Sequence, residues 1–406
     1  MNAIPLAARL PLFATPHRLL FFVGASNVLL AMLWWTLFLI GLRWPALALP
    51  VPASVPPGWL HAALMQYQML ASFVFGFLLT VFPRWMGLPE LPRWRYVPVG
   101  LGLFGGQLAT LSGAFGAPGA LQAGALMTLA GWLAGMSALW SLLWRDPGTT
   151  WHARACFAAL VCGLVGLCCW LAFLFGGSPR WAFCAIKLGG FGFLFPMYFT
   201  VAHRMFPFFA QSAMPGYRPW RPLWLLASLW VLAFAHLGLE LMHAYRWLWI
   251  ADAPMLALSL WMLWRWWPRG PQLPLLRALF LGLVWLPVAF ALYLAQSAIY
   301  ALIGVHVLGR APAHALFVGF FGSVLVAMVT RVSQGHSGRP LVMPPVARYA
   351  FVAIQCVAVL RVAAELAPDG GAWQAVAAAA WLVALTPWAM RIGHIVVTPR
   401  VDGKAG

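Results

Sequence analysis

The chain has 406 residues, of which 63% are hydrophobic and only 8% are charged, and its mean hydropathy is +0.86. These values exclude a soluble globular protein and predict an all-α, polytopic membrane protein, because lipid offers no partner to unpaired backbone groups. The 25 Lys and Arg residues against seven Asp and Glu give a net charge of +18, but the arginines stand singly near predicted helix ends. We therefore expect the lipid bilayer, and no nucleic acid, as a partner.

Twelve apolar segments are long enough to cross a bilayer, and proline and glycine residues mark most of the joints between them. No polar stretch is long enough for a separate soluble domain, so we expect one integral membrane domain over residues 1–406. The predicted helices cover residues 18–42, 60–84, 96–115, 119–144, 152–175, 180–207, 221–244, 247–267, 275–306, 312–333, 346–367 and 372–393.

Basic residues predict the orientation of these helices. If both termini and alternate loops lie on one side, that side holds 19 of the 25 Lys and Arg residues, and the other side holds six. Positive charge accumulates on the cytoplasmic side, so both termini should be cytoplasmic and the number of crossings even. The six cysteines lie inside predicted helices without a CxxC pair, which argues against disulfides or a thiolate metal site.

The segment from His314 to His336 predicts one membrane-crossing helix with a histidine near each surface. The 21 residues between the two histidines are mostly apolar. A helix of this length spans roughly 33 Å, about the thickness of the hydrocarbon core. Gly319, Gly322 and Ser323 form a stripe of small residues that should let another helix approach closely.

The ten histidines separate by predicted depth into two layers. The outer layer consists of His61, His243, His306 and His314, with His236 deeper in the same half of the membrane, and the inner layer consists of His17, His152, His203, His336 and His394. His236, Glu240 and His243 are spaced by four and three residues and should share one helix face. An acid inside a membrane helix is costly, so Glu240 is a candidate proton-handling group, and Lys187 is a functional candidate on the same ground.

Imidazoles at one depth on several helices provide the ligands that haem iron or a copper ion requires. The candidate cofactor-binding residues are His61, His314, His236, His243 and His306, with Arg204 and Arg331 as partners for an anionic edge of haem. The candidate metal ligands are His61, Met65, His314, His17, His203 and His336. For any single histidine and for Met65, a structural role is the simpler explanation, whereas for the arginines cytoplasmic anchoring and anion binding are equally simple. Composition alone therefore leaves metal and proton chemistry open.

Four stretches of the chain resemble the NnrS family of bacterial integral membrane proteins. They are HAALMQYQMLASFVFGFLLTVFPRW from His61, HRMFPFF from His203, MVTRVSQGHSGRPL over 328–341 together with His314–Ala315, and PLFATPHRLLFF over 11–22. The resemblance implies twelve helices, haem b and copper as cofactors, location in the bacterial inner membrane, and a role in nitric oxide stress during denitrification. The family commonly has HAHEM where this chain has HAALM, so Ala63 and Leu64 replace a histidine and a glutamate.

These observations predict a haem-binding membrane protein, with copper as a second metal, that binds or turns over a diatomic ligand such as nitric oxide. Whether it is an enzyme stays open at this stage, as does the identity of an electron donor or oxidase partner. A transporter or channel for a small anion, a proton or copper could use the same histidines as relays. An assembly factor that hands haem or copper to an oxidase is the third alternative.

Overall fold

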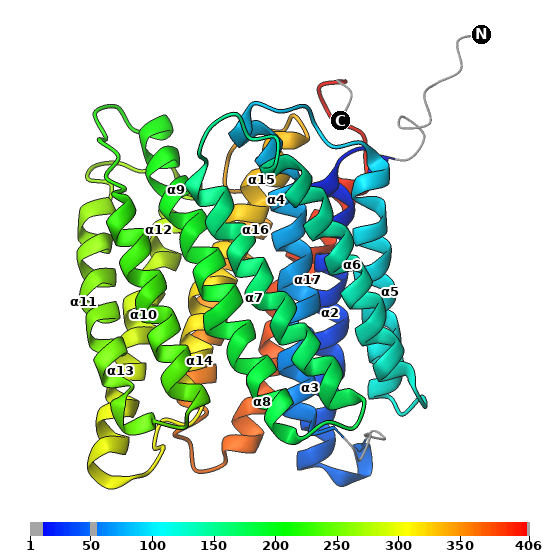
Figure 1. Cartoon of the computed structure of the whole chain (residues 1–406), viewed down its shortest axis with the longest axis vertical. Helices are drawn as coiled ribbons and strands as arrows, with labels where there is room; N and C mark the ends of the chain where they lie inside the picture. Colours follow the sequence, from blue (N-terminus) through cyan, green and yellow to red (C-terminus); the bar gives the residue numbers. More distant parts are fainter. Residues whose placement is uncertain (1–10, 49–54, 404–406) are drawn as a thin grey trace. The chain divides into compact units, whose positions relative to one another are not determined.

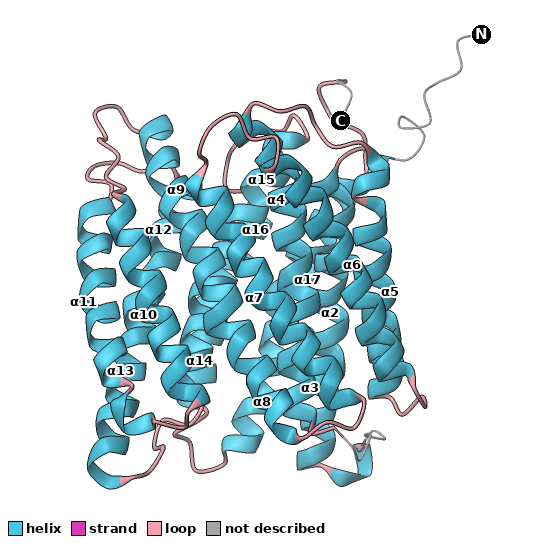
Figure 2. Cartoon of the chain, viewed as in Figure 1, coloured by secondary structure: helices cyan, strands magenta, loops and turns pink. Residues whose placement is uncertain are grey.

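The computed structural model describes residues 11–48 and 55–403, and all regular secondary structure in these ranges is helical (Figure 2). The described residues form the twelve long helical runs that the sequence predicts, and eleven of them are long and apolar enough to cross a membrane. The fold class is therefore confirmed. Arg9 and Lys404, which entered the charge count, lie outside the described residues, and the cytoplasmic location of the termini stays a prediction.

Several runs begin with proline at the first helical turn, where its missing N–H costs nothing. The runs can be followed by label in Figure 1, and their bounds are α2 (Pro16–Arg43), α3–η3–α4 (Pro57–Ala63, Leu64–Leu70, Ala71–Met86), α5 (Val97–Ala114), α6 (Ala120–Leu143), α7 (Trp151–Leu174), α8–η5–α9 (Pro179–Lys187, Leu188–Leu194, Phe195–Ala213), α10 (Leu223–Leu241), η6–α11 (Tyr245–Trp247, Trp249–Trp266), α12–α13 (Pro274–Leu283, Trp285–Ile303), α14–η7–α15 (Ala311–His314, Ala315–Gly322, Ser323–His336), α16 (Pro345–Ala363) and α17 (Gly370–Val397).

The described residues group into two compact units, each with its own buried apolar interior. The first unit contains the described residues up to Leu194, Val332–Leu341 and the described residues from Thr386 onward. The second unit contains Phe195–Arg331 and Val342–Leu385. The single domain expected over residues 1–406 stays a prediction.

Three of the runs contain a segment of π-helix, which the sequence analysis did not predict. The segments η3, η5 and η7 begin at residues 64, 188 and 315, which are 124 and 127 residues apart. They belong to the second, sixth and tenth runs, so the twelve runs form three successive sets of four. The membrane windows of these runs are 83, 72 and 78% buried, against at most 56% in the other eight candidate spans. Because π-segments are rare and often mark functional sites, these three runs are the strongest candidates to carry a functional site.

In the first unit, the chain ends of the described part lie on the same side. The buried guanidinium of Arg18, near the start of α2, donates to the Val396 carbonyl at 3.2 Å and to the Thr398 carbonyl at 2.8 Å, at the end of α17. An even number of crossings requires this arrangement. Tyr96, just before α5, donates to the Phe13 carbonyl at 2.8 Å, and burial raises the pKa of Tyr96 to about 12, so it remains a donor at neutral pH.

In the second unit, the expected stripe of small residues lies against neighbouring helices. A Cβ added at Gly282 of α12 would lie 2.9 Å from Cβ of Ser323, and one added at Gly322 would lie 3.5 Å from Ile354 of α16. The indole of Trp285 covers Gly319 and donates to Gln355 at 2.6 Å, and Gln355 in turn donates to the Ser323 hydroxyl at 2.7 Å. The predicted close approach is confirmed.

Helices α5 and α6 of the first unit pack through glycine residues. Such close packing is common in membranes, because the hydrophobic effect does not drive helices together in lipid. A Cβ added at Gly102 would lie 2.6 Å from Cα of Gly131 on the facing helix, so there is no room for a methyl group. A Cβ added at Gly238 of α10 would meet nothing within 4 Å.

We expect Gly102→Ala to destabilise the protein by roughly 1–3 kcal/mol, because the two backbones must move apart. Gly238→Ala is the matched control and should be neutral or stabilising by up to about 1 kcal/mol, since alanine is the better helix former. Thermal unfolding of both variants in the same detergent measures the difference. Equal midpoints would contradict the proposed helix contact.

Candidate functional site

The first two π-segments are joined to each other by side chains within the first unit. Tyr67, in η3, donates its hydroxyl to the Ala185 carbonyl at 2.6 Å, and Gln66 donates to the Ile186 carbonyl at 3.1 Å. Both carbonyls lie in the last turn of α8, where the backbone passes into η5. In a bilayer, a carbonyl displaced from α-helical bonding needs another donor, and these side chains supply one. Gly189 allows the contact, because a Cβ there would collide with Gln66.

His61 lies three residues before η3, in the short helix α3. Its imidazole is half-buried and stacks on Trp35 of α2, with ring centroids 4.4 Å apart and an interplanar angle of 12°. The indole thus fixes the plane of the imidazole. Met65 is the second residue of η3, four residues after His61.

His314 is the last residue of α14, immediately before η7. Its Nδ1 lies 2.9 Å from the carbonyl oxygen of Arg310, which can only accept, so Nδ1 carries the proton. In the neutral imidazole the lone pair is therefore on Nε2. Glu365 supports this turn, because its carboxylate accepts from the Arg310 amide at 3.1 Å and pairs with Arg361 at 2.6 Å.

His236 lies fully buried in α10, with acidic groups near both ring nitrogens. Its Nδ1 is 2.7 Å from Oδ1 of Asp252 in α11, and its Nε2 is 3.6 Å from Oε2 of Glu240, one turn along α10. The ring of Tyr293, from α13, meets the imidazole edge-on at 5.1 Å. With carboxylates on both sides, this imidazole is arranged to hold protons.

His243 does not share the helix face of His236 and Glu240, contrary to the prediction. Helix α10 ends at Leu241, and His243 follows with φ of 55°, in the left-handed region. Its Nδ1 lies 2.8 Å from the hydroxyl of Tyr245. The ring of Tyr245 meets that of His306 at 5.0 Å, so the structure does bring the neighbourhoods of His243 and His306 together at the exposed end of this unit.

The first unit brings together two of the inner histidines. The rings of His17 and His336 are 4.4 Å apart and tilted by 48°, and Arg84 donates to Nε2 of His336 at 3.2 Å. Glu90 accepts from Arg84 at 3.1 Å. Axial ligands of one haem lie on opposite faces with the iron between them, so rings this close do not fit a bis-histidine haem. Neighbouring imidazoles do suit a small ion such as copper.

The remaining predicted residues belong to the second unit: His203 and Arg204 lie in α9, and Arg331 lies in α15. Nε2 of buried His203 is 3.1 Å from the Pro222 carbonyl, which therefore accepts from it. The guanidinium of Arg331 stacks 4.0 Å from the ring centroid of Phe209. The guanidinium of Arg221 donates to the backbone carbonyl of Arg204 at 3.4 Å. The guanidinium of Arg204 takes no part in that contact.

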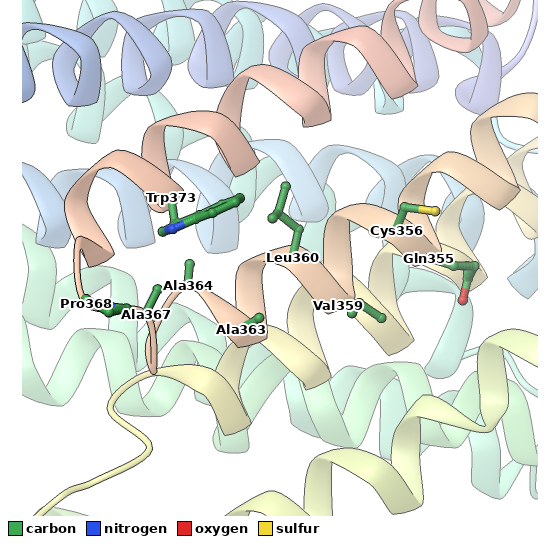
Figure 3. A pocket seen from close by; sticks show the side chains of 9 residues that line it. All are labelled: Gln355, Cys356, Val359, Leu360, Ala363, Ala364, Ala367, Pro368 and Trp373. Carbon is green, nitrogen blue, oxygen red and sulfur yellow. The ribbon is translucent and has the colours of Figure 1, made fainter.

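An apolar groove of about 740 Å³ lies in the second unit along α16 and the start of α17. Figure 3 shows Trp373 toward one end of the groove and Gln355 and Cys356 toward the other. No histidine is among its lining residues, so the imidazoles expected for haem do not come from this groove. Within the described residues, no three His, Cys, Asp or Glu side chains are grouped so as to hold a metal ion.

The donor chemistry at two positions nevertheless fits haem. His61 and His314 each precede a π-segment in the most buried runs, and His314 presents the tautomer that metal-bound histidines usually have, with the other ring N–H on a carbonyl. His236 does not fit, because its nitrogens face carboxylates.

The sequence analysis missed Asp252, the nearest partner of His236. The sequence did contain an indication, because Asp252 lies inside the predicted helix 247–267. Burying its carboxyl group in the membrane is as costly as burying that of Glu240. Glu240 is four residues from His236 in the same helix, so the sequence alone pairs these two residues. Asp252 reaches His236 from the next helix, and only the fold reveals that contact.

The fold and these side chains define a class: a polytopic helical membrane protein with an imidazole before two of the three π-segments in its most buried spans. The chain matches the family described as NnrS protein over residues 11–400, nearly its whole length. It therefore belongs to the NnrS family, as its sequence motifs predicted. Membership agrees with a general role in the response to nitric oxide. No curated protein matches the chain.

We expect Tyr67→Phe to destabilise the protein by about 1–3 kcal/mol, because it leaves the Ala185 carbonyl without this donor in an apolar interior. Tyr349→Phe is the matched control. Tyr349 is exposed and donates to the Val383 carbonyl at 3.2 Å, so its loss should cost under about 0.5 kcal/mol. Chemical or thermal unfolding compares the two, and equal losses would show that the bridge between η3 and η5 contributes little.

Proposed function

We propose that this NnrS-family chain is a haem-binding protein of the bacterial inner membrane that acts in the nitric oxide response or in denitrification. The observation that carries the proposal is the bond from Nδ1 of His314 to the Arg310 carbonyl, which leaves the lone pair on Nε2 beside a π-segment. Family membership supports the nitric oxide role.

His61, in the first unit, and His314, in the second, are each proposed as a residue that would bind haem b. They lie near the start of the second and the tenth helical run. Bound haem iron would supply an axial position for a diatomic ligand such as nitric oxide, or electron transfer if both axial positions were filled by histidine.

The chain's own residues prepare these imidazoles. Trp35 holds the ring plane of His61, and Glu365 fixes the Arg310 turn that sets the tautomer of His314. Both imidazoles are half-buried. Arg204 and Arg331 are proposed partners of the anionic edge of a haem near the inner histidines, because Arg331 follows His314 by roughly 25 Å along the same helical run. An electron donor, or an oxidase that receives the cofactor, is the proposed protein partner.

Copper is the proposed second metal. His17 and His336 are adjacent imidazoles in the first unit and would offer two nitrogen ligands if Nε2 of His336 exchanged its bond from Arg84 for the metal. This pair is independent of the haem positions, because neither residue belongs to the outer layer of histidines.

His61→Ala and His314→Ala should each remove or shift the haem absorption bands of the purified protein, because each deletes a proposed axial nitrogen. His394→Ala, an exposed histidine of α17, is the control and should leave the spectrum unchanged. Reduced-minus-oxidised spectra, with iron and copper quantified on the same samples, provide the measurement.

An unaltered Soret band in both variants would refute the ligand assignment. A colourless wild-type protein expressed with ample haem would refute the haem proposal and favour the transporter alternative. Cofactor that appears only in a complex with a partner would favour an assembly factor.

A further inference from the structure

The cluster around His236 is separate from the proposed haem positions and has features of its own. His236 and Asp252 have no exposed surface, and their bond of 2.7 Å joins α10 to α11 in the membrane part of the second unit. Oδ2 of Asp252 is also buried, and among the described residues it has no hydrogen-bond partner. An ionised carboxylate with one bare oxygen in an apolar interior is costly, and a proton on that oxygen removes the cost.

We propose that His236, Asp252 and Glu240 form a proton-exchange site within the membrane. A proton from water on the side where α10 ends passes to the carboxylates, with Asp252 as its buried acceptor, and it returns to water by the same route. The imidazole, with its nitrogens toward the two carboxylates, passes the proton from one to the other.

The route to water is built from residues at the end of α10. Glu240 is 94% buried and lies one residue before the end of the helix, three residues before the exposed His243. His243 contacts Tyr245, and Tyr245 contacts the exposed His306. These groups all carry exchangeable protons, so the path from bulk water to Glu240 is lined with donors and acceptors.

The other titratable groups that face the site are tyrosines. Tyr293 from α13 lies close enough to interact electrostatically with both Glu240 and Asp252, and Tyr245 from η6 interacts with Glu240. Each hydroxyl can donate to an ionised carboxylate. The site therefore takes up a proton without opening the helices to water.

The test uses the full-length protein in detergent and does not depend on haem or on nitric oxide. Dicyclohexylcarbodiimide reacts with protonated carboxyl groups in apolar surroundings, and peptide mass spectrometry locates the adduct. We expect labelling at Asp252 or Glu240 that falls about tenfold per pH unit above the midpoint, as for a single proton. Asp252→Asn and Glu240→Gln should remove it at the substituted position.

Asp146→Asn is the matched control, because Asp146 lies in the loop between α6 and α7 and should not affect labelling. The carbonyl stretch of a protonated carboxyl group in infrared difference spectra is the second readout, and it needs only the wild-type protein. Absence of both signals wherever the protein stays folded would mean a permanent ion pair and overturn the proposal. Protection by sodium at constant pH would overturn it in favour of a sodium site.

Discussion

The interior of a bilayer contains no water, so each backbone carbonyl there must find its donor within the protein. A regular helix meets this requirement alone, but a π-segment disturbs it at its start. In the first unit the requirement is met by Tyr67 and Gln66, whose side chains donate to carbonyls at the start of η5. Separating the two buried runs would leave these carbonyls unpaired, so the two hydrogen bonds stabilise the contact between the runs. In the second unit, close glycine contacts and the bond from Trp285 to the Gln355 side chain hold the run that contains η7 against its neighbours.

The same rule of complementary donors and acceptors determines what each histidine can do. A carbonyl oxygen at Nδ1 of His314 and a guanidinium at Nε2 of His336 require the same tautomer, with the proton on Nδ1, because the carbonyl only accepts and the guanidinium only donates. The carboxylates near His236 instead favour an imidazole that carries protons. The three histidines thus differ in what surrounds their ring nitrogens. The deciding partner lies one turn away for His314 and on another helix for His336 and for Nδ1 of His236.

Hydropathy and breaker residues were sufficient to predict all twelve helices, since crossing a bilayer constrains length and composition strongly. The motifs around His61, His203 and residues 328–341 were sufficient for the family. Neither hydropathy nor the motifs could reveal the π-segments. These runs are almost uniformly apolar, so an extra residue per turn leaves no visible change in the hydropathy pattern. The position of His243 was also beyond reach, since α10 ends two residues earlier, in a run that still reads as helical. Asp252 needed the fold, because its partner lies on another helix.

The regular spacing of the π-segments divides the described chain into three sets of four helical runs, with the irregular turn always in the second run of a set. The polar residue before that turn differs among the sets. His61 lies three residues before η3, whereas Lys187 and His314 lie immediately before η5 and η7. Two sets therefore place an imidazole before the irregular turn and the other places an ammonium group there, so the three buried runs cannot share one ligand chemistry.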